Sequence, residues 1–347
     1  MINNIKKAAF SFNEKYVSQA LNEIKGSSEA LKNAGLKYIG GAVGGFQLAE
    51  FETGRTELVS AIKSAELVFV RHCCTYEYEY EIQVDTEPIS ELADLLIKRM
   101  GDNPDLTAFS IQGRAFEQKE KALLDSIREE LEEKLLSEGK TLEVKYPEQI
   151  ISLYLKDNVL MAGVGLPSEN LSRWSGGMAH YKQETWEVSR SMYKLMEAFE
   201  VFQITTAGGE KVLDLGASPG GWSSVMMRRG MRVTAVDTEE MSEKIKDQKA
   251  LEFIKANIEE VDLGDKVFDI LVSDMSLNAT KMAKAFCRAA KWLKDDGYAV
   301  VTVKLSADKP VKSLTDVKKI YSEIFEILGC KQLFHNREEV TLYLKKK

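Results

Sequence analysis

The spacing of hydrophobic and polar positions is typical of a mixed α/β protein. Apolar side chains recur at helical spacing over residues 14–33, 88–100 and 116–137. The last of these segments places Leu124, Ile127 and Leu131 on one face and charged residues on the other. Further strands are predicted near residues 141–146 and 150–163, so helices and strands are interleaved through the first half.

A change to a period of two between residues 66 and 84 predicts a strand. Tyr76, Tyr78 and Tyr80 alternate with glutamates there, which indicates one aromatic face and one face in water. An aromatic row could stack nucleic-acid bases. The favoured interpretation is that the tyrosines pack the sheet against a helix.

Two other segments invite a functional interpretation. Paired glycines at 40–41 and 44–45 lack the strand, G-x-G-x-x-G and helix context of a nucleotide loop, so they predict turns and bulges. The irregular stretch 166–187 mixes tryptophans with His180, Tyr181 and Lys182. It could line an RNA path, but an inter-domain linker held by its tryptophans is the simpler interpretation.

Charge and composition limit the class of protein. The 347 residues carry 47 basic and 54 acidic side chains, a net charge of −7, which argues against binding nucleic acid by bulk charge. The excess of acidic residues lies in residues 1–180, which hold 20 basic and 28 acidic residues. Residues 181–347 hold 27 basic and 26 acidic residues. Residues 291–347 hold 12 basic and 8 acidic residues, so a polyanion surface would lie there; a solvated surface is the alternative.

The four cysteines and three histidines show no metal-ligand spacing, so we expect no metal. No apolar run approaches the length of a membrane span, and the N-terminus lacks the apolar core of a signal peptide. We therefore expect a cytoplasmic protein in a reducing compartment, with no membrane and no DNA partner.

The strongest motif begins at residue 211. A buried-strand pattern, KVLDLG, runs directly into Ala217-Ser218-Pro219-Gly220-Gly221-Trp222 and then into a helix ending near Gly230. Strand, glycine turn and helix form a ligand-binding βα unit in which the absent Cβ atoms let backbone approach a ligand. The next strand ends at Asp237, where a carboxylate can accept hydrogen bonds from ribose hydroxyls.

These residues resemble a known family. Residues 214–241 are similar to the first motif of FtsJ-like ribose methyltransferases, and the chain resembles the bacterial family that methylates a cytidine 2′-oxygen of 23S rRNA. SRSMYKLMEAFEVF at 189–202 and LFHNREEVTLYL at 333–344 carry the rest of the resemblance. The first half is similar only loosely, around residues 66–71, to that family's small α/β module and THUMP-type domain.

The resemblance implies a Lys-Asp-Lys-Glu catalytic set. Lys194, Asp274, Lys304 and Glu339 match it in order. Glu339 is preferred to Glu338 because the family's glutamate directly precedes the valine of the closing strand. We expect Lys304 beside Asp274, buried with Lys194, as proton acceptor or as stabiliser of the developing alkoxide. Glu339 would hold Lys194 or the ribose.

The resemblance also implies S-adenosylmethionine (SAM) as cofactor. Its expected binding residues are Ser191, Gly216, Ser218, Pro219, Gly220, Gly221, Trp222, Asp237, Asn257 and Asp274. The family carries aspartate where this chain has Asn257, and an asparagine carbonyl can still accept a hydrogen bond, so we expect binding of altered strength. Residues 275–278 lack the family's proline, which leaves the shape of that loop open.

Together these features predict an α/β protein in four parts. They are a small module at 1–60, a THUMP-like RNA-binding domain at 61–165, a linker at 166–187 and a Rossmann-like methyltransferase domain at 188–347. The last should hold a mostly parallel seven-stranded sheet closed by an antiparallel hairpin of 330–336 and 339–345. Its expected activity is SAM-dependent ribose 2′-O-methylation of RNA, with 23S rRNA or a large-subunit assembly intermediate as partner. Another RNA such as tRNA, a silent RNA-binding or assembly factor, and a small-molecule methyltransferase remain alternatives.

Overall fold

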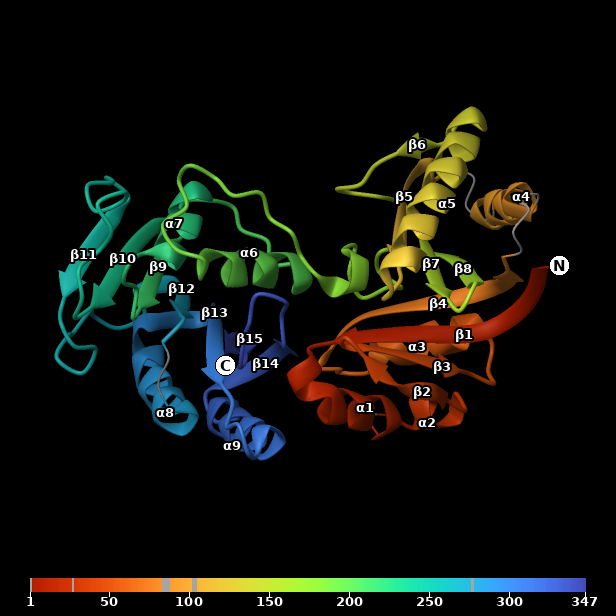
Figure 1. The fold of residues 1–347 in the computed structure, drawn as a ribbon. Helices are drawn as coiled ribbons and strands as arrows, with labels where there is room; N and C mark the ends of the chain where they lie inside the picture. The colour runs from red at the N-terminus through yellow and green to blue at the C-terminus, as the bar shows by residue number, and fades with distance from the viewer. Residues whose placement is uncertain (1, 27, 83–87, 102–104, 276–277) are drawn as a thin grey trace. The chain divides into compact units, whose positions relative to one another are not determined.

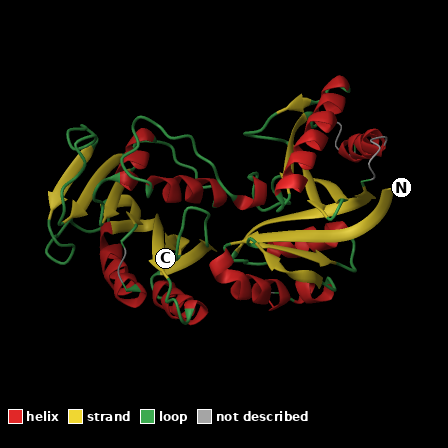
Figure 2. Ribbon diagram, viewed as in Figure 1, coloured by secondary structure: helices red, strands yellow, loops and turns green. Residues whose placement is uncertain are grey.

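The computed structural model describes residues 2–26, 28–82, 88–101, 105–275 and 278–347. The chain divides into two compact units, Met1–Met178 and Ala179–Lys347. Figures 1 and 2 show that each contains a sheet with helices packed on it. The boundary falls inside the predicted linker 166–187. No helix in the part of the chain that the structure describes is both long and apolar enough to cross a bilayer.

One eight-stranded sheet, in the order β2-β3-β1-β4-β8-β7-β5-β6, organises the first unit. Its strands are β1 (Ile2–Phe12), β2 (Lys37–Val43), β3 (Phe46–Glu50), β4 (Val70–Glu81), β5 (Ala108–Arg114), β6 (Thr141–Leu142), β7 (Gln149–Lys156) and β8 (Val159–Gly165). Strand β1 pairs with both β3 and β4, so the sheet is continuous through the segments 1–60 and 61–165. The division at residue 60 and the THUMP-like character of this unit stay predictions.

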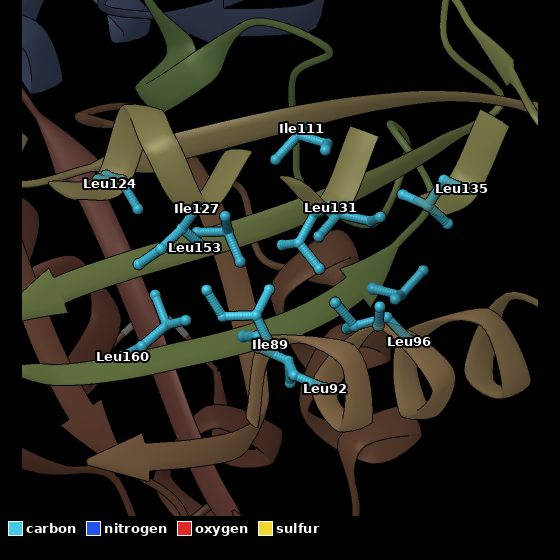
Figure 3. Close-up of a cluster of buried hydrophobic side chains, with 14 of the residues drawn as sticks. Ile89, Leu92, Leu96, Ile111, Leu124, Ile127, Leu131, Leu135, Leu153 and Leu160 are labelled. Carbon is cyan, nitrogen blue, oxygen red and sulfur yellow. The ribbon is translucent and has the colours of Figure 1, made fainter. Parts of the chain in front are cut away.

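Helices α4 (Pro88–Met100) and α5 (Gln118–Ser137) build the core on one face of this sheet. Both agree with the helices predicted from periodicity. Leu124, Ile127, Leu131 and Leu135 are buried at spacings of three and four residues, which turns one stripe of α5 toward the strands. Figure 3 shows this stripe facing leucines of α4 and of strands β7 and β8.

The alternating tyrosine segment forms strand β4, as predicted, although residues 83–84 of the expected strand lie outside the described residues. Tyr76 and Tyr80 are 2% and 3% exposed, so they pack in the interior. The expectation that the glutamate face lies in water holds only at Glu81, whereas Glu77 and Glu79 are partly buried. Glu77 is partly buried in ion pairs with Arg55 (Nε to Oε1, 3.2 Å) and Arg99 (Nε to Oε1, 3.1 Å), because this strand is central in the sheet.

Several predicted boundaries in this unit change. The helix expected at 14–33 is divided into a 3₁₀ turn, α1 (Val17–Gly26) and α2 (Glu29–Asn33). Ser28 caps the second helix, because its side chain accepts from the backbone N–H of Leu31.

The strand expected at 141–146 extends only over Thr141–Leu142. The segment 150–163 is a hairpin, because Asp157 and Asn158 take positive φ angles and form its two-residue turn. The remaining helix is α3 (Arg55–Ser64).

The paired glycines form a turn and a bulge, as predicted. Gly44 and Gly45 connect β2 to β3 with φ angles of 55° and 68°. The β2–β3 register shifts between Ile39 and Val43, around Gly40 and Gly41.

The second unit contains a seven-stranded sheet in the order β11-β10-β9-β12-β13-β15-β14. Its strands are β9 (Lys211–Leu215), β10 (Arg232–Asp237), β11 (Leu251–Lys255), β12 (Phe268–Ser273), β13 (Leu293–Lys304), β14 (Phe325–Lys331) and β15 (Glu339–Lys346). Strand β15 runs antiparallel to both of its neighbours, and the pairs among β9 to β13 are parallel. The predicted mostly parallel, Rossmann-like α/β fold is confirmed.

Helices on both faces cover this sheet: α6 (Met192–Val201), α7 (Gly221–Arg228), α8 (Ala279–Ala289) and α9 (Pro310–Ser322). Helices α6 and α7 lie on one face, and α8 and α9 lie on the other (Figure 1). The strand predicted at 330–336 instead ends at Lys331. Residues 332–338 form a loop, because Leu333 is buried while the backbone N–H of Asn336 donates back to its carbonyl (3.2 Å).

Candidate active site

The carboxyl ends of the parallel strands meet at one edge of the second sheet. Leu215 of β9 pairs with Ser273 of β12, which in turn pairs with Val301 of β13. The residues that follow or end these strands therefore come together, and in open α/β sheets this edge is where ligands bind. Gly216, Asp237, Asp274 and Lys304 all belong to this edge.

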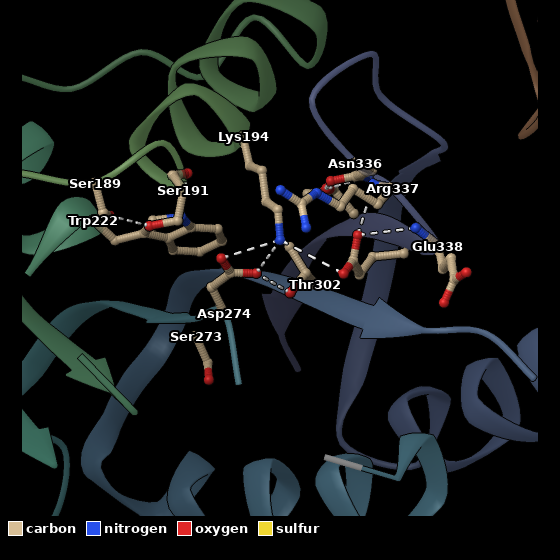
Figure 4. Close-up of polar contacts among 12 residues, drawn as sticks. Ser189, Ser191, Lys194, Trp222, Ser273, Asp274, Thr302, Asn336, Arg337 and Glu338 are labelled. Carbon is tan, nitrogen blue, oxygen red and sulfur yellow. Dashed lines mark hydrogen bonds and ion pairs between the residues drawn. The ribbon is translucent and has the colours of Figure 1, made fainter. Parts of the chain in front are cut away.

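Lys194 and Asp274 form the centre of a charged cluster (Figure 4). The Lys194 Nζ atom lies 2.9 Å from Asp274 Oδ1 and 3.2 Å from Oδ2. Thr302 of β13 donates its hydroxyl to Asp274 Oδ1 at 2.6 Å. The side chains of Lys194 and Asp274 are only 14% and 15% exposed, so water screens this pair weakly.

Glu339 is the third charged member. Its Oε1 atom lies 3.7 Å from Lys194 Nζ, and its Oε2 atom accepts from the backbone N–H groups of Arg337 (2.8 Å) and Glu338 (3.2 Å). The two carboxylates of Asp274 and Glu339 thus share one ammonium group. Glu338 instead has its Oε2 atom 3.9 Å from Lys304 Nζ, so the glutamate beside Lys194 is Glu339, the residue that the sequence analysis preferred.

Lys304 occupies a different position from the one expected. It is the last residue of β13 and pairs across the sheet with Glu339, so it belongs to the correct edge. Its side chain is 50% exposed, and its Nζ atom lies 3.9 Å from Glu338 Oε2. The expectation that Lys304 is buried with Lys194 and held by Asp274 was wrong, because Lys194 already occupies the carboxylate of Asp274.

Burial shifts the acid–base behaviour of two aspartates here. Burial raises the pKa of Asp274, against the opposing effects of Lys194 and of the Thr302 hydrogen bond. Asp214, in the middle of β9, is 1% exposed, and burial raises its pKa to about 7 although Ser223 donates to its Oδ2 atom at 2.6 Å. Asp214 was not predicted as a site residue.

The glycine loop between β9 and α7 is tightly packed. Gly220 has a φ of 104°, and a Cβ atom on it would lie 2.1 Å from Ile245 Cδ1. A Cβ atom on Gly216, whose φ is 68°, would lie 2.0 Å from Met275 Cγ. Only glycine fits both positions. Pro219 precedes the helix cap Gly220, and its carbonyl accepts from the backbone N–H of Ser242 at 3.0 Å.

Asp237 and Ser218 are joined across this loop. The backbone N–H of Ser218 donates to Asp237 Oδ2 at 2.9 Å, and Glu239 donates its backbone N–H to Oδ1 at 2.9 Å. Each carboxylate oxygen keeps a further lone pair for a ligand hydroxyl. Asn257 lies two residues beyond Lys255, which pairs with Asp237, and its side-chain oxygen accepts from the backbone N–H of Glu259 at 3.1 Å.

Ser191 and Trp222 connect α6 to the glycine loop. The Trp222 indole N–H donates to the Ser191 carbonyl at 2.9 Å, and the hydroxyls of Ser189 and Ser191 lie 2.7 Å apart. A Cβ atom on Gly221 would lie 2.3 Å from the first hydroxyl and 2.5 Å from the second. The predicted SAM-binding residues thus lie along one closely packed glycine loop and its neighbours, which carry acceptor groups suited to a polar ligand.

Glu197 was missed by the sequence analysis. It is 4% exposed and lies one helical turn after Lys194 on α6. Its carboxylate accepts from the backbone N–H groups of Phe334 (2.7 Å) and His335 (2.9 Å), and it contacts His335 Nδ1 at 2.8 Å. It therefore ties the loop that leads into Glu339 to the helix that carries Lys194. A glutamate among the apolar side chains of the segment 189–202 was the available signal.

Comparison with known proteins finds similar sequences among methyltransferases. Residues 187–306 match the FtsJ-like methyltransferase family. The chain is 31% identical over 206 residues to Ribosomal RNA large subunit methyltransferase M from Psychromonas ingrahamii, covering 55% of each chain. The protein of the same name from Shewanella denitrificans is 33% identical over 191 residues, covering 51% of each chain. The chain thus spans about half the length of these curated relatives.

Similarity to solved structures is weaker. TrmN from Thermus thermophilus is 14% identical, with 99% of this chain and 100% of that chain covered, at a TM-score of 0.38. That score is too low to carry an argument about function.

Proposed function

Because residues 187–306 form an FtsJ-like methyltransferase domain, we propose that the protein transfers the methyl group of SAM to a ribose 2′-hydroxyl of RNA. The names of its relatives point to large-subunit ribosomal RNA as the substrate. The sequence resemblance makes a cytidine of 23S rRNA the proposed target, either in free rRNA or in an assembly intermediate.

The observation that carries the proposal is the convergence of Lys194, Asp274 and Glu339 at the strand edge that also holds the glycine loop. A ribose hydroxyl is a weak nucleophile, so the site must align it and handle its proton. A buried cation between two carboxylates is a fixed electrostatic element, held in place before substrate arrives. Bound SAM would supply a methyl group on a good sulfonium leaving group.

The residues present fit SAM. Gly220 and Gly221 keep the turn between β9 and α7 free of Cβ atoms, which would collide with neighbouring side chains. Asp237 ends the strand next to this loop, where a ribose-binding carboxylate is found in doubly wound folds. Ser191, Ser218 and Trp222 border this loop, and Asn257 follows β11. These residues would hold the cofactor, together with Asp274 near its methionyl group.

The proposed roles follow from burial. Lys194 would hold Asp274 and Glu339 in a fixed arrangement, since all three side chains are mostly buried. Lys304 is half-exposed, so its amine can contact an incoming ribose. In its neutral form it would accept the 2′-hydroxyl proton, and in its charged form it would stabilise the developing alkoxide while the proton passes to water. Glu339, which pairs with Lys304 across the sheet, would orient either amine or the ribose.

The proposal is tested by substitution with separate binding and transfer assays. We expect Lys194→Ala and Lys304→Ala to reduce methyl transfer to rRNA by about 10²- to 10⁴-fold. SAM binding measured by calorimetry should persist. Lys345→Ala is the matched control, because Lys345 lies at the opposite end of β15 in an exposed pair with Asp296. Transfer that is undiminished in Lys304→Ala would remove that residue from the mechanism.

Mapping ribose methylation in a strain that lacks the protein identifies the substrate. One missing mark in 23S rRNA is the expected result. A mark missing from tRNA would reassign the substrate. Complete marks in all RNAs, with SAM binding absent in vitro, would favour a silent RNA-binding or assembly factor.

A further inference from the structure

A cavity separate from the charged cluster lies beside α7, on the side of that helix next to residues 244–250. Its volume is about 590 Å³, within the range of about 300–1,000 Å³ that is usual for small-molecule pockets. Trp186, Ser224, Arg228, Lys244, Ile245 and Gln248 line it. None of the predicted catalytic or cofactor residues is among its lining residues.

One aromatic ring and two cations dominate the chemistry of this cavity. The Arg228 guanidinium lies 4.2 Å from the centre of the Trp186 ring. Lys244 donates from Nζ to the Glu187 carbonyl at 2.6 Å, which positions its ammonium group and leaves two further donors. Within the described residues, no carboxylate is in ion-pair distance of Arg228 or Lys244. The cavity is therefore suited to an anion.

We infer that this cavity binds a nucleotide of the RNA substrate, with the base against the Trp186–Arg228 pair and a phosphate between Arg228 and Lys244. Indole rings stack bases without regard to sequence, and guanidinium and ammonium groups recognise phosphate. Ser224 and Gln248 add neutral hydrogen-bonding groups to the lining. The assignment of RNA, rather than a free nucleotide, rests on the proposed function.

The position of the cavity indicates which nucleotide it would take. Helix α7 begins at Gly221, beside Ser189 and Ser191, and ends at Arg228. The seven residue-to-residue steps of this eight-residue helix span about 10 Å. Ile245 lines the cavity and also packs against Gly220, so one side chain separates the cavity from the glycine loop. The cavity would thus hold a nucleotide that flanks the methylated one and fix the register of the RNA.

The experiment measures the affinity of the full chain for a fluorescently labelled single-stranded RNA by anisotropy. Trp186→Ala should weaken binding at least about 5-fold, the lower end of the effect of losing one base stack. Arg228→Ala and Lys244→Ala should each weaken it and reduce the salt dependence by about one phosphate contact. Lys246→Ala is the matched control, since Lys246 lies on the same segment, pairs with Glu243 and does not line the cavity.

Unchanged RNA affinity in all three cavity variants, with unchanged melting temperatures, would overturn the inference. A titration with AMP, followed by tryptophan fluorescence against a Trp186→Phe reference, distinguishes the two sources of a nucleotide. Quenching by AMP with no effect of the variants on RNA affinity would assign the cavity to a free nucleotide and reject the RNA assignment. SAM binding and the activity of Lys194→Ala are independent readouts, so failure of this inference leaves the proposed function intact.

Discussion

At the scale of single residues, Asp214 gives the second unit a pH-dependent stability. Its folded pKa of about 7 lies above the ordinary aspartate value of 3.8. The folded state therefore holds the proton more tightly than the unfolded state, and stability decreases as the pH rises from about 4 to about 7. At about 1.4 kcal/mol per tenfold change in the acid constant, the decrease is on the order of 4 kcal/mol.

The variant Asp214→Asn removes this titration while keeping an acceptor for the Ser223 hydroxyl. We expect the melting temperature of the parent protein to decrease relative to the variant between about pH 4 and about pH 7, and the difference to be constant above about pH 8. Thermal unfolding at a series of pH values measures it. Parallel curves for the two proteins across this range would show that Asp214 is not the titrating group.

Gly221 provides a second prediction at this scale, for cofactor binding. A Cβ atom there would lie 2.3 Å from the Ser189 hydroxyl and 2.5 Å from the Ser191 hydroxyl, so Gly221→Ala displaces both from the loop. We expect SAM binding to weaken at least about tenfold, which corresponds to about 1.4 kcal/mol. Calorimetry measures the affinity. Gly26→Ala is the control, because a Cβ atom on Gly26 meets no atom within 4 Å; equal affinities in both variants would contradict the assignment.

At the scale of elements, α6 controls the loop between β14 and β15. The helix carries Lys194 and Glu197 one turn apart, and Glu197 holds the backbone N–H groups of Phe334 and His335. The same loop then donates two backbone N–H groups to Glu339. Glu197 is thus a positioning residue, since it acts on the site through this loop.

Glu197→Gln replaces one accepting oxygen with an amide donor that faces an N–H group, so the loop loses part of its attachment. We expect kcat to fall by up to about 100-fold, as for a displacement on the order of 1 Å, while SAM affinity changes little. Glu200→Gln is the control on the same helix, because the Glu200 carboxylate accepts from the Tyr181 hydroxyl (3.2 Å), a donor that lies outside this loop. Equal losses of kcat and SAM affinity in Glu197→Gln would indicate general destabilisation instead.

Element by element, periodicity predicted the long amphipathic segments best. Helices α4 and α5 and strand β4 each have a face that the hydrophobic pattern defines. The segment 14–33 keeps helical spacing across a break that depends on a local cap at Ser28, and the strand expected at 330–336 is interrupted because Leu333 turns into the core. Such breaks depend on single contacts, and the spacing of hydrophobic residues along the chain does not indicate where those contacts form.

In the candidate site, too, the sequence predicted some residues correctly and missed others. The family resemblance selected Lys194, Asp274 and Glu339, and the structure brings all three into one cluster. Asp274 follows β12, Glu339 begins β15 opposite the end of β13, and α6 carries Lys194. The environment of Lys304 could not be predicted, since it depends on which carboxylate each lysine reaches. Glu197 and Thr302 escaped notice because their partners lie 137 and 28 residues away in the sequence.

At the scale of the whole molecule, charge is distributed unevenly. The unit Met1–Met178 contains 20 basic and 28 acidic residues. The unit Ala179–Lys347 contains 27 basic and 26 acidic residues. Part of the basic excess near the C-terminus is neutralised within the fold. Lys345 lies 2.9 Å from Asp296, and Lys346 lies 3.7 Å from Asp295. These two lysines are therefore less available to phosphate groups, and the net charge of −7 argues against binding by bulk charge.

This distribution predicts a weak salt dependence of RNA binding. Each phosphate neutralised on a single strand contributes about −0.7 to the slope of log K against log salt concentration, so about three contacts give a slope near −2. Anisotropy titrations of the full chain at a series of KCl concentrations measure the slope. Arg228→Ala should make it shallower, whereas Lys345→Ala should leave it unchanged because Asp296 already pairs with that lysine. A slope steeper than about −5 would instead require a broad basic surface, and it would contradict recognition by shape with only local phosphate contacts.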